Sequence, residues 1–421
     1  MKKIGLLLCV LLAAETRAGD DPFAFDLTAA ENSEEASAAV KTRFSNSLEG
    51  RLGKYFRKSG FLSSRLRLNS SLLMDAGYAS LYVSGMLDYD EAVRHYDKRS
   101  RASLYEFYGK LNGSSYGLSG FQISAGKMRV SWGVSDGRST IDVINASYFR
   151  DPMANGRTVL KWPSWVIRAE QATFAGNVEG VFLPFGKDRK MPKYDSPWES
   201  DSIHALREAD RKGVISFREH PNPRKAEWGV RYIKYMTGAD AGISYYSGFT
   251  DYPALRKEGS RTVLMEPVRS RTVSINGAMA RGSSTLRAET AFTAHFPVYD
   301  ESGDLRYSDV AQVIAGCDRN LDGGIYLNGQ LFYDRYSSYR DDYGLTFALS
   351  QKYFNDSLNV GINALYGREN EHSVEVFAEY AVSDSLSMNI RGYWIGGGPA
   401  YGMYRSYDRN DYAELGFKYY L

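Results

Sequence analysis

The stretch DYAELGFKYYL, residues 411–421, decides the fold class. Its odd positions from Ala413 to Leu421 are apolar or aromatic, and its even positions are mostly polar, small or amphipathic. Alternation with a period of two is typical of a β-strand with one apolar and one polar face. Because the pattern continues to an apolar last residue, we expect this strand to pair with the first strand and close a barrel that has no free edge.

The first residues predict a secretory signal peptide over residues 1–18. Lys2 and Lys3 precede an apolar run at residues 4–14, which is too short to span a membrane as a helix. Small residues at the cleavage positions put the expected cut near Ala18. Cys9 leaves a lipoprotein signal open, but that alternative would shorten the apolar core to residues 4–8. Residues 19–40 are acidic and small, and we expect them to form a periplasmic segment that leads into a barrel over residues 41–421.

Composition excludes several classes of protein. Lys and Arg number 52 and Asp and Glu number 50, so the chain is close to neutral, which argues against nucleic acid as a partner. Cys317 is the one cysteine beyond the signal peptide, so we expect no internal disulfide. No Pro- or Ser-rich linker divides the chain into domains. An exported chain with a mean hydropathy of −0.41, 32 Tyr and many alternating segments fits a membrane β-barrel.

The alternation begins near residue 43 and is clearest at residues 62–72, 165–170, 226–232, 286–296, 325–334, 374–382 and 386–394. It assigns Leu62 to the same apolar face as Leu66, and it assigns Phe296 to an apolar face opposite His295. Apolar faces on so many strands are too extensive for one sandwich, so we expect them to contact lipid while the polar faces line a lumen. The charged residues predicted to line the lumen are Arg65, Arg67, Arg168, Glu170, Arg231, Arg287, Glu289, Glu375, Glu379, Arg391, Glu414 and Lys418. Such a set gives a hydrated lining with a transverse field, although cross-strand pairing for stability is the simpler role for any one of them.

The connections between these segments alternate short and long. Short turns of Gly, Asn, Asp and Ser are predicted at residues 75–77, 112–115, 176–177, 237–240, 282–284, 319–322, 355–357 and 383–385. With nine outer connections they predict a barrel of about eighteen strands, and sixteen is the alternative. The longest outer loops are predicted near residues 128–163 and 187–223, and we expect one or two of them to narrow the mouth. The second contains a possible helix capped by Ser202 and ended by Gly213, which is either a surface helix or a segment folded into the mouth.

Residues 126–145, GKMRVSWGVSDGRSTIDVIN, contain the candidate constriction. The apolar residues change from odd to even positions at Gly126, which indicates a bulge or a close backbone approach. The simpler interpretation is a strand that ends in its loop. The alternative is a constriction that carries the charged residues Lys127, Arg129, Asp136, Arg138 and Asp142.

The same stretch resembles a porin-like outer-membrane family catalogued as a domain of unknown function, which is similar to alginate-export-type barrels. The matching positions are Gly126, Lys127, Trp132, Gly133, Asp136, Asp142 and Asn145, whereas the family usually follows that Asn with Pro and this chain has Ala146. The resemblance implies an outer-membrane channel and supplies no catalytic residues. The terminal strand also resembles the signal read by the barrel-assembly machinery, although such signals usually end in an aromatic residue rather than Leu421.

Two other classes of function remain open from sequence. Gly133 to Gly137 matches the G-x-S-x-G pattern of an esterase with Ser135 as nucleophile, but that pattern requires a helix next, and residues 138–145 show no helical period. The second class is a barrel that sheathes or scaffolds a partner protein. Residues 318–323 match half of an EF-hand loop, yet its twelfth position is Gly329 rather than Glu, so we predict no metal, and no CxxCH motif predicts a haem. We therefore expect a transmembrane antiparallel β-barrel in the cell outer membrane that passes small solutes without enzymatic chemistry, while the solute and the oligomeric state stay open.

Overall fold

The computed structural model describes residues 40–135, 137–151, 161–222, 224–300, 303–398 and 403–421. The predicted signal peptide and nearly all of the predicted periplasmic segment lie outside the described residues. The first strand begins at Lys41.

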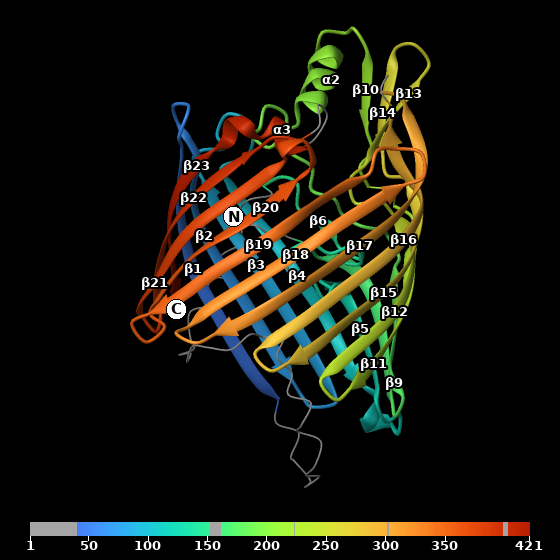
Figure 1. Ribbon diagram of the computed structural model, residues 1–421, viewed down its shortest axis with the longest axis vertical. Helices are drawn as coiled ribbons and strands as arrows, with labels where there is room; N and C mark the ends of the chain where they lie inside the picture. The colour runs from blue at the N-terminus through green and yellow to red at the C-terminus, as the bar shows by residue number, and fades with distance from the viewer. Residues whose placement is uncertain (1–39, 136, 152–160, 223, 301–302, 399–402) are drawn as a thin grey trace, which may run out of the picture.

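Among the described residues, eighteen strands form one antiparallel sheet that closes on itself (Figure 1). The barrel strands are β1 (Lys41–Tyr55), β2 (Phe61–Asp75), β3 (Ala79–Asp90), β4 (Ser100–Asn112), β5 (Phe121–Met128), β8 (Ser164–Thr173), β9 (Gly176–Leu183), β11 (Glu227–Met236), β12 (Ala239–Phe249), β15 (Arg269–Arg281), β16 (Ser284–Tyr299), β17 (Leu305–Leu321), β18 (Ile325–Tyr336), β19 (Asp342–Tyr353), β20 (Leu358–Gly367), β21 (His372–Ser383), β22 (Leu386–Gly396) and β23 (Tyr412–Tyr420). Each pairs with its neighbours along the chain, and β23 pairs with β1 from Tyr420 opposite Ser47 to Tyr412 opposite Tyr55. The predicted fold class, strand count and closure by the terminal strand are confirmed.

The two faces of the wall differ as the alternation predicts. Large apolar side chains point out of the barrel, with 67% of Leu331, 53% of Leu415 and 45% of Val376 exposed. Their polar neighbours Gln330 and Glu375 are buried on the lumen side. Since an exposed apolar band around a closed barrel is stable only against lipid, the protein spans a membrane, and barrels of this kind lie in the outer membrane.

Short turns lie at one end of the barrel and long loops at the other (Figure 1). All eight predicted short turns are present between consecutive strands. Three predicted positions are shifted, because residues 176–177 already belong to β9, residues 239–240 already belong to β12, and residues 319–321 still belong to β17. The longest connections are residues 129–163, here called the lumen loop, and residues 184–226, here called the mouth loop.

Two assignments to faces are wrong, and a bulge explains each. The register between β1 and β2 shifts at Gly53, and Leu62 lies inside the barrel at 7% exposure. The register between β16 and β17 shifts after Thr293. Beyond that shift His295 is exposed against Tyr307, and Phe296 packs beside Tyr336. One extra residue exchanges the two faces of every residue that follows.

The remaining elements belong to loops or turns. Within the loops lie β6 (Ala146–Ser147), β7 (Lys161–Trp162), α2 (Asp201–Arg211), β10 (Ser216–Glu219), β13 (Ala254–Glu258), β14 (Thr262–Glu266), α3 (Met403–Ser406) and the 3-10 turns η1 (Gly113–Tyr116), η2 (Arg368–Asn370) and η3 (Asp408–Asn410). The helix predicted in the second long loop is α2, but its N-cap is Ser200 rather than Ser202. Gly213 follows its end with a φ of 70°, as predicted. No helix among the described residues is long and apolar enough to cross a membrane.

Candidate constriction of the lumen

The lumen loop leaves β5 and crosses the inside of the barrel. Its Trp132 carbonyl accepts a hydrogen bond from Arg231 on β11 at 3.1 Å, and its Val134 carbonyl accepts one from Arg287 on β16 at 3.1 Å. Arg138 reaches β18, which is the eighth strand around the wall from β5 in a barrel of eighteen. The loop therefore spans the lumen almost from one side to the other.

Glu289 on β16 is the main anchor of this loop. Its carboxylate accepts hydrogen bonds from the backbone N–H groups of Val134 at 2.7 Å, Ser135 at 2.8 Å and Thr140 at 2.8 Å. The Ser139 hydroxyl donates a fourth at 2.8 Å. Only 1% of Glu289 is exposed, and hydrogen bonds to a buried carboxylate are among the stronger ones in proteins. The sequence predicts that Glu289 places its charge in the lumen. In the structure the Glu289 carboxylate holds the lumen loop.

A second attachment lies further along the loop. The Gln330 side-chain carbonyl accepts hydrogen bonds from the backbone of Gly137 at 3.0 Å and Arg138 at 3.3 Å. The Arg138 guanidinium pairs with Asp334 at 2.5 Å and lies 3.7 Å from Asp342. A side chain on Gly137 would collide with Thr346 on β19, so this close approach to the wall requires glycine.

The base of the loop is clamped by Asn145. Its side-chain amide donates to the Met128 carbonyl at 3.1 Å, and its oxygen accepts from the Val130 N–H at 2.6 Å. The apolar residues that follow the phase change, among them Val130 and Trp132, are buried in one cluster inside the barrel. Gly126 has a φ of 141°, and a Cβ there would lie 2.2 Å from the Phe107 carbonyl. Of the two alternatives at Gly126, the structure shows the close backbone approach, since the register between β4 and β5 is continuous.

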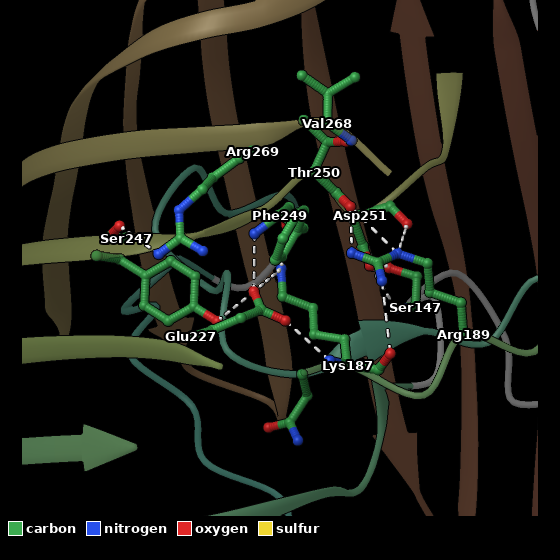
Figure 2. A network of polar contacts seen from close by, with 12 residues as sticks. Ser147, Lys187, Arg189, Glu227, Ser247, Phe249, Thr250, Asp251, Val268 and Arg269 are labelled. Carbon is green, nitrogen blue, oxygen red and sulfur yellow. Dashed lines mark hydrogen bonds and ion pairs between the residues drawn. The ribbon is translucent and has the colours of Figure 1, made fainter. Parts of the chain in front are cut away.

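The mouth loop is fixed to the wall by a second buried carboxylate, Glu227 at the start of β11 (Figure 2). Glu227 accepts from the Lys187 N–H, the Phe249 N–H and the Tyr246 hydroxyl at 2.8, 2.8 and 2.9 Å. The Lys187 ammonium lies 4.0 Å from Glu227 and donates to the Phe249 carbonyl at 2.8 Å. Burial lowers the pKa of Lys187 to about 8, although Glu227 opposes that shift.

Asp251 joins the lumen loop to this network (Figure 2). It accepts from the Ser147 N–H at 2.9 Å and from the Ser147 hydroxyl, and Lys161 lies 3.3 Å away. Burial opposes its ionisation, but Lys161 and Lys187 outweigh burial and hold the pKa of Asp251 below its usual range. Arg189 donates to the Asp251 carbonyl at 2.7 Å. The two long loops are therefore fixed together as well as to the wall.

The mouth loop also crosses to the opposite side of the barrel. Trp198 packs with Tyr55, Leu62, Tyr393 and other buried residues contributed by β1, β2, β22 and β23. The Tyr407 hydroxyl donates to the Trp198 carbonyl at 2.9 Å. Leu62, which sequence assigns to the lipid face, thus belongs to the surface that receives this loop.

The remaining lumen charges mostly form ion pairs along the wall. The pairs are Arg65 with Asp90 at 3.1 Å and with Asp151 at 2.5 Å, Arg67 with Asp88 at 2.6 Å, Arg168 with Glu179 at 2.7 Å and Glu170 at 2.9 Å, Arg231 with Glu179 at 3.5 Å, Arg287 with Asp318 at 2.8 Å, Arg391 with Glu375 at 2.6 Å and Glu379 at 3.4 Å, and Lys418 with Glu49 at 3.8 Å. Glu414 lies directly across the sheet from Arg391. Charges of both signs therefore alternate around the lumen.

The predicted constriction residues do not form one ring. Lys127 donates to the Leu104 carbonyl at 2.6 Å, and the exposed Arg129 begins the lumen loop with its backbone bonded to Glu106 at 3.0 Å. Arg138 is at the far wall, as described above. Asp142 is enclosed within the loop, where burial raises its pKa. Asp136 lies outside the described residues.

The other motifs occupy ordinary places. The backbone N–H of Ser135 donates a hydrogen bond to Glu289, and the described residues on either side of Ser135 form neither strand nor helix. Asp318 belongs to β17 and pairs with Arg287. Among the described residues, no group of three or more His, Cys, Asp or Glu side chains is placed to hold a metal ion.

Sequence reasoning missed the residues that hold the loops, namely Glu106, Gln330, Glu227 and Asp251, and it missed Trp198. The alternation of the sequence does place Glu227 and Gln330 on the polar face. Nothing in a single sequence distinguishes a polar residue that faces water from one that faces the backbone of a distant loop.

Neither a family model nor a curated protein matches this chain. Among solved structures, the chain is similar to OmpF of Salmonella typhi in complex with daunomycin, with 10% identity and a TM-score of 0.45 over 90% of this chain and 97% of that one. It is also similar to a mutant of the Rh. blastica porin, with 12% identity and a TM-score of 0.42 over 90% of this chain and 100% of that one. OmpTdeltaL8 of Vibrio cholerae, a loop-deletion mutant of an outer membrane protein, has 10% identity and a TM-score of 0.44 over 91% of this chain and 100% of that one. These values describe a general likeness of shape, so the fold assignment depends on the strand pairing and side-chain exposure of this chain itself.

Proposed function

We propose that the protein is a non-enzymatic channel through which small polar solutes cross the outer membrane. The observation that carries this proposal is the lumen loop, which crosses the inside of a closed barrel and is bound to the opposite wall by Glu289 and Gln330. A fixed loop of this kind narrows a lumen while the strands keep their pairing.

The lining supports polar rather than apolar solutes. The wall carries the paired charges of Arg67, Arg391 and Glu375, and such pairs give a field across the passage with little net charge. A solute must exchange its hydration for contacts with this lining, so small size and hydrogen-bonding capacity favour passage. Ser135 offers no support for an esterase, because no described residue gives its buried Oγ a hydrogen-bond partner that could act as a base, and residues 137–145 form no helix. The lipid and the barrel-assembly machinery would be its partners during insertion.

Planar-bilayer conductance of the purified full chain tests the proposal. We expect stepwise conductance in potassium chloride and a shift toward cation selectivity in Arg391→Glu, since Arg391 lies on the lumen wall. Arg94→Glu is the matched control, because Arg94 lies in the loop between β3 and β4 with 57% of its side chain exposed. Absence of conductance from folded protein would contradict the proposal. Ester hydrolysis that is lost in Ser135→Ala would favour the enzyme instead.

A further inference from the structure

A second polar site lies outside the constriction, where three outer loops meet. A cavity of about 320 Å³ is lined by Lys58 of the loop between β1 and β2, by Asp195, Ser196, Pro197 and His204 of the mouth loop, and by Arg409 of the loop before β23. Since one water occupies roughly 30 Å³ in the liquid, the cavity has room for about ten non-hydrogen atoms.

One side of the cavity offers hydrogen-bond donors with positive charge. Lys58 donates to the Asn410 side chain at 3.2 Å, and Arg409 pairs with Asp201 at 3.5 Å. Burial and the nearby Arg409 both lower the pKa of Lys58, so the two cations lie close enough to repel each other. An anion between them would relieve that repulsion.

The loop that carries Ser196 holds this side of the cavity in place. Only 4% of Ser196 is exposed, and its N–H donates to the Lys193 carbonyl at 3.1 Å. The cavity therefore has a fixed wall on the side of the mouth loop.

The cavity also offers acceptors. Asp195 contributes a carboxylate. His204 is hydrogen-bonded through Nδ1 to Glu199 at 2.8 Å, and Glu199 also accepts a hydrogen bond from Arg207 at 2.6 Å. A carboxylate accepts, so Nδ1 donates and the remaining nitrogen, Nε2, is an acceptor. The site thus combines two cations with two acceptors.

We propose that this cavity binds a small monocarboxylate that also carries a hydroxyl or amino group, and that it captures such solutes at the outer mouth. The carboxylate would contact Lys58 and Arg409, and the hydroxyl or amino group would donate to Asp195 or His204. A dianion fits less well, because Asp195 opposes a second negative charge. The role of the cavity as a capture site rests on the proposed channel function. The binding of the solute itself does not require conductance.

Saturation-transfer NMR on the purified full chain in detergent tests the binding, with L-lactate, L-alanine and acetate as probes. We expect saturable binding of lactate or alanine that exceeds the binding of acetate at least about ten-fold, the value of one hydrogen bond to a charged group. Arg409→Met and Lys58→Met should each weaken binding by a similar factor. Lys98→Met is the matched control, because Lys98 is an exposed lysine of the neighbouring loop and should leave binding unchanged.

Three results would overturn the inference: no saturable binding of lactate and alanine, equal binding of acetate, or unchanged binding in both Arg409→Met and Lys58→Met. Conductance of the same preparation separates the two proposals. Normal conductance without binding would refute this site and leave the channel standing, whereas binding without conductance would refute the channel and leave the binding site standing.

Discussion

Replacing Glu289 by alanine should release the lumen loop. In the folded protein this one carboxylate accepts four hydrogen bonds of 2.7–2.8 Å from Val134, Ser135, Ser139 and Thr140. A single hydrogen bond to a charged group contributes about 1.5–3 kcal/mol, but bonds that share one carboxylate are not additive. Removing one partner of a buried charged network costs about 3–5 kcal/mol, which we take as the loss in docking free energy. Since about 1.4 kcal/mol is a factor of ten, the docked population should fall by roughly two to three orders of magnitude relative to the undocked one.

Single-channel recording in planar bilayers measures this release. Glu289→Ala should show a larger mean conductance and much greater open-channel noise than the wild type, because the loop no longer stays against β16. Glu289→Gln keeps the shape of the side chain and one acceptor oxygen, so its conductance and noise should lie between those of the wild type and those of Glu289→Ala. Glu170→Ala is the matched control, since Glu170 is a lumen carboxylate that pairs with Arg168 on its own strand. Heat-modifiable migration on gels confirms that each variant is folded. Wild-type conductance and noise in a folded Glu289→Ala barrel would refute the role of this residue as the anchor.

Three further predictions follow from the loops and the wall. Trp198→Ala should cost about 3–5 kcal/mol of mouth-loop docking and make that loop cleavable by added protease, whereas unchanged resistance would contradict its place in the buried cluster. Burial and Asp342 raise the pKa of Glu371 to about 7 from 4.5, so its contribution to stability is full below pH 4.5 and is lost as the pH rises through 7. Glu371→Gln should therefore raise the free energy of unfolding by about 2 kcal/mol at pH 8, seen as a higher Tm, and should leave it unchanged at pH 4. An equal change at pH 4 and pH 8 would exclude this titration. Leu331→Arg should cost about 2–4 kcal/mol in urea titrations of folding into liposomes, while Asn389→Arg on the lumen side should cost much less; equal costs would contradict the assignment of the faces.

Sequence could predict the barrel because its wall follows a simple local rule. Every strand has lipid on one side and the lumen on the other, so the period of two in residues 411–421 or 374–382 is a direct consequence of the fold. The turns between strands are short enough for Gly, Asn and Asp to mark them. The errors at Leu62 and Phe296 have one cause, because a bulge adds a residue without a signal in composition.

The candidate site could be predicted only in part, because its contacts join distant parts of the chain. Alternation places Glu289 and Arg391 on the lumen side, and the structure agrees. It does not reveal that Glu289 faces the backbone of Val134, which lies 155 residues earlier in the chain. Trp198 is a similar case, since its neighbours Tyr393 and Tyr407 follow it by about two hundred residues. A single sequence carries no pairing rule for such contacts.

The same physics explains why the anchors are carboxylates. The loops bury apolar side chains such as Trp132 and Trp198 against the wall, but that burial does not satisfy their backbone polar groups. Their backbone N–H groups lack strand partners, and a carboxylate can accept several of them at once, as Glu289 does for the lumen loop and Glu227 for the mouth loop. A lysine at the same place would leave those N–H groups without acceptors. The negative charge must in turn be balanced, and Lys187, which lies 4.0 Å from Glu227, contributes that balance from the mouth loop. Anchoring and near-neutrality of the lumen are therefore linked, and ten of the eighteen barrel strands carry charges of both signs.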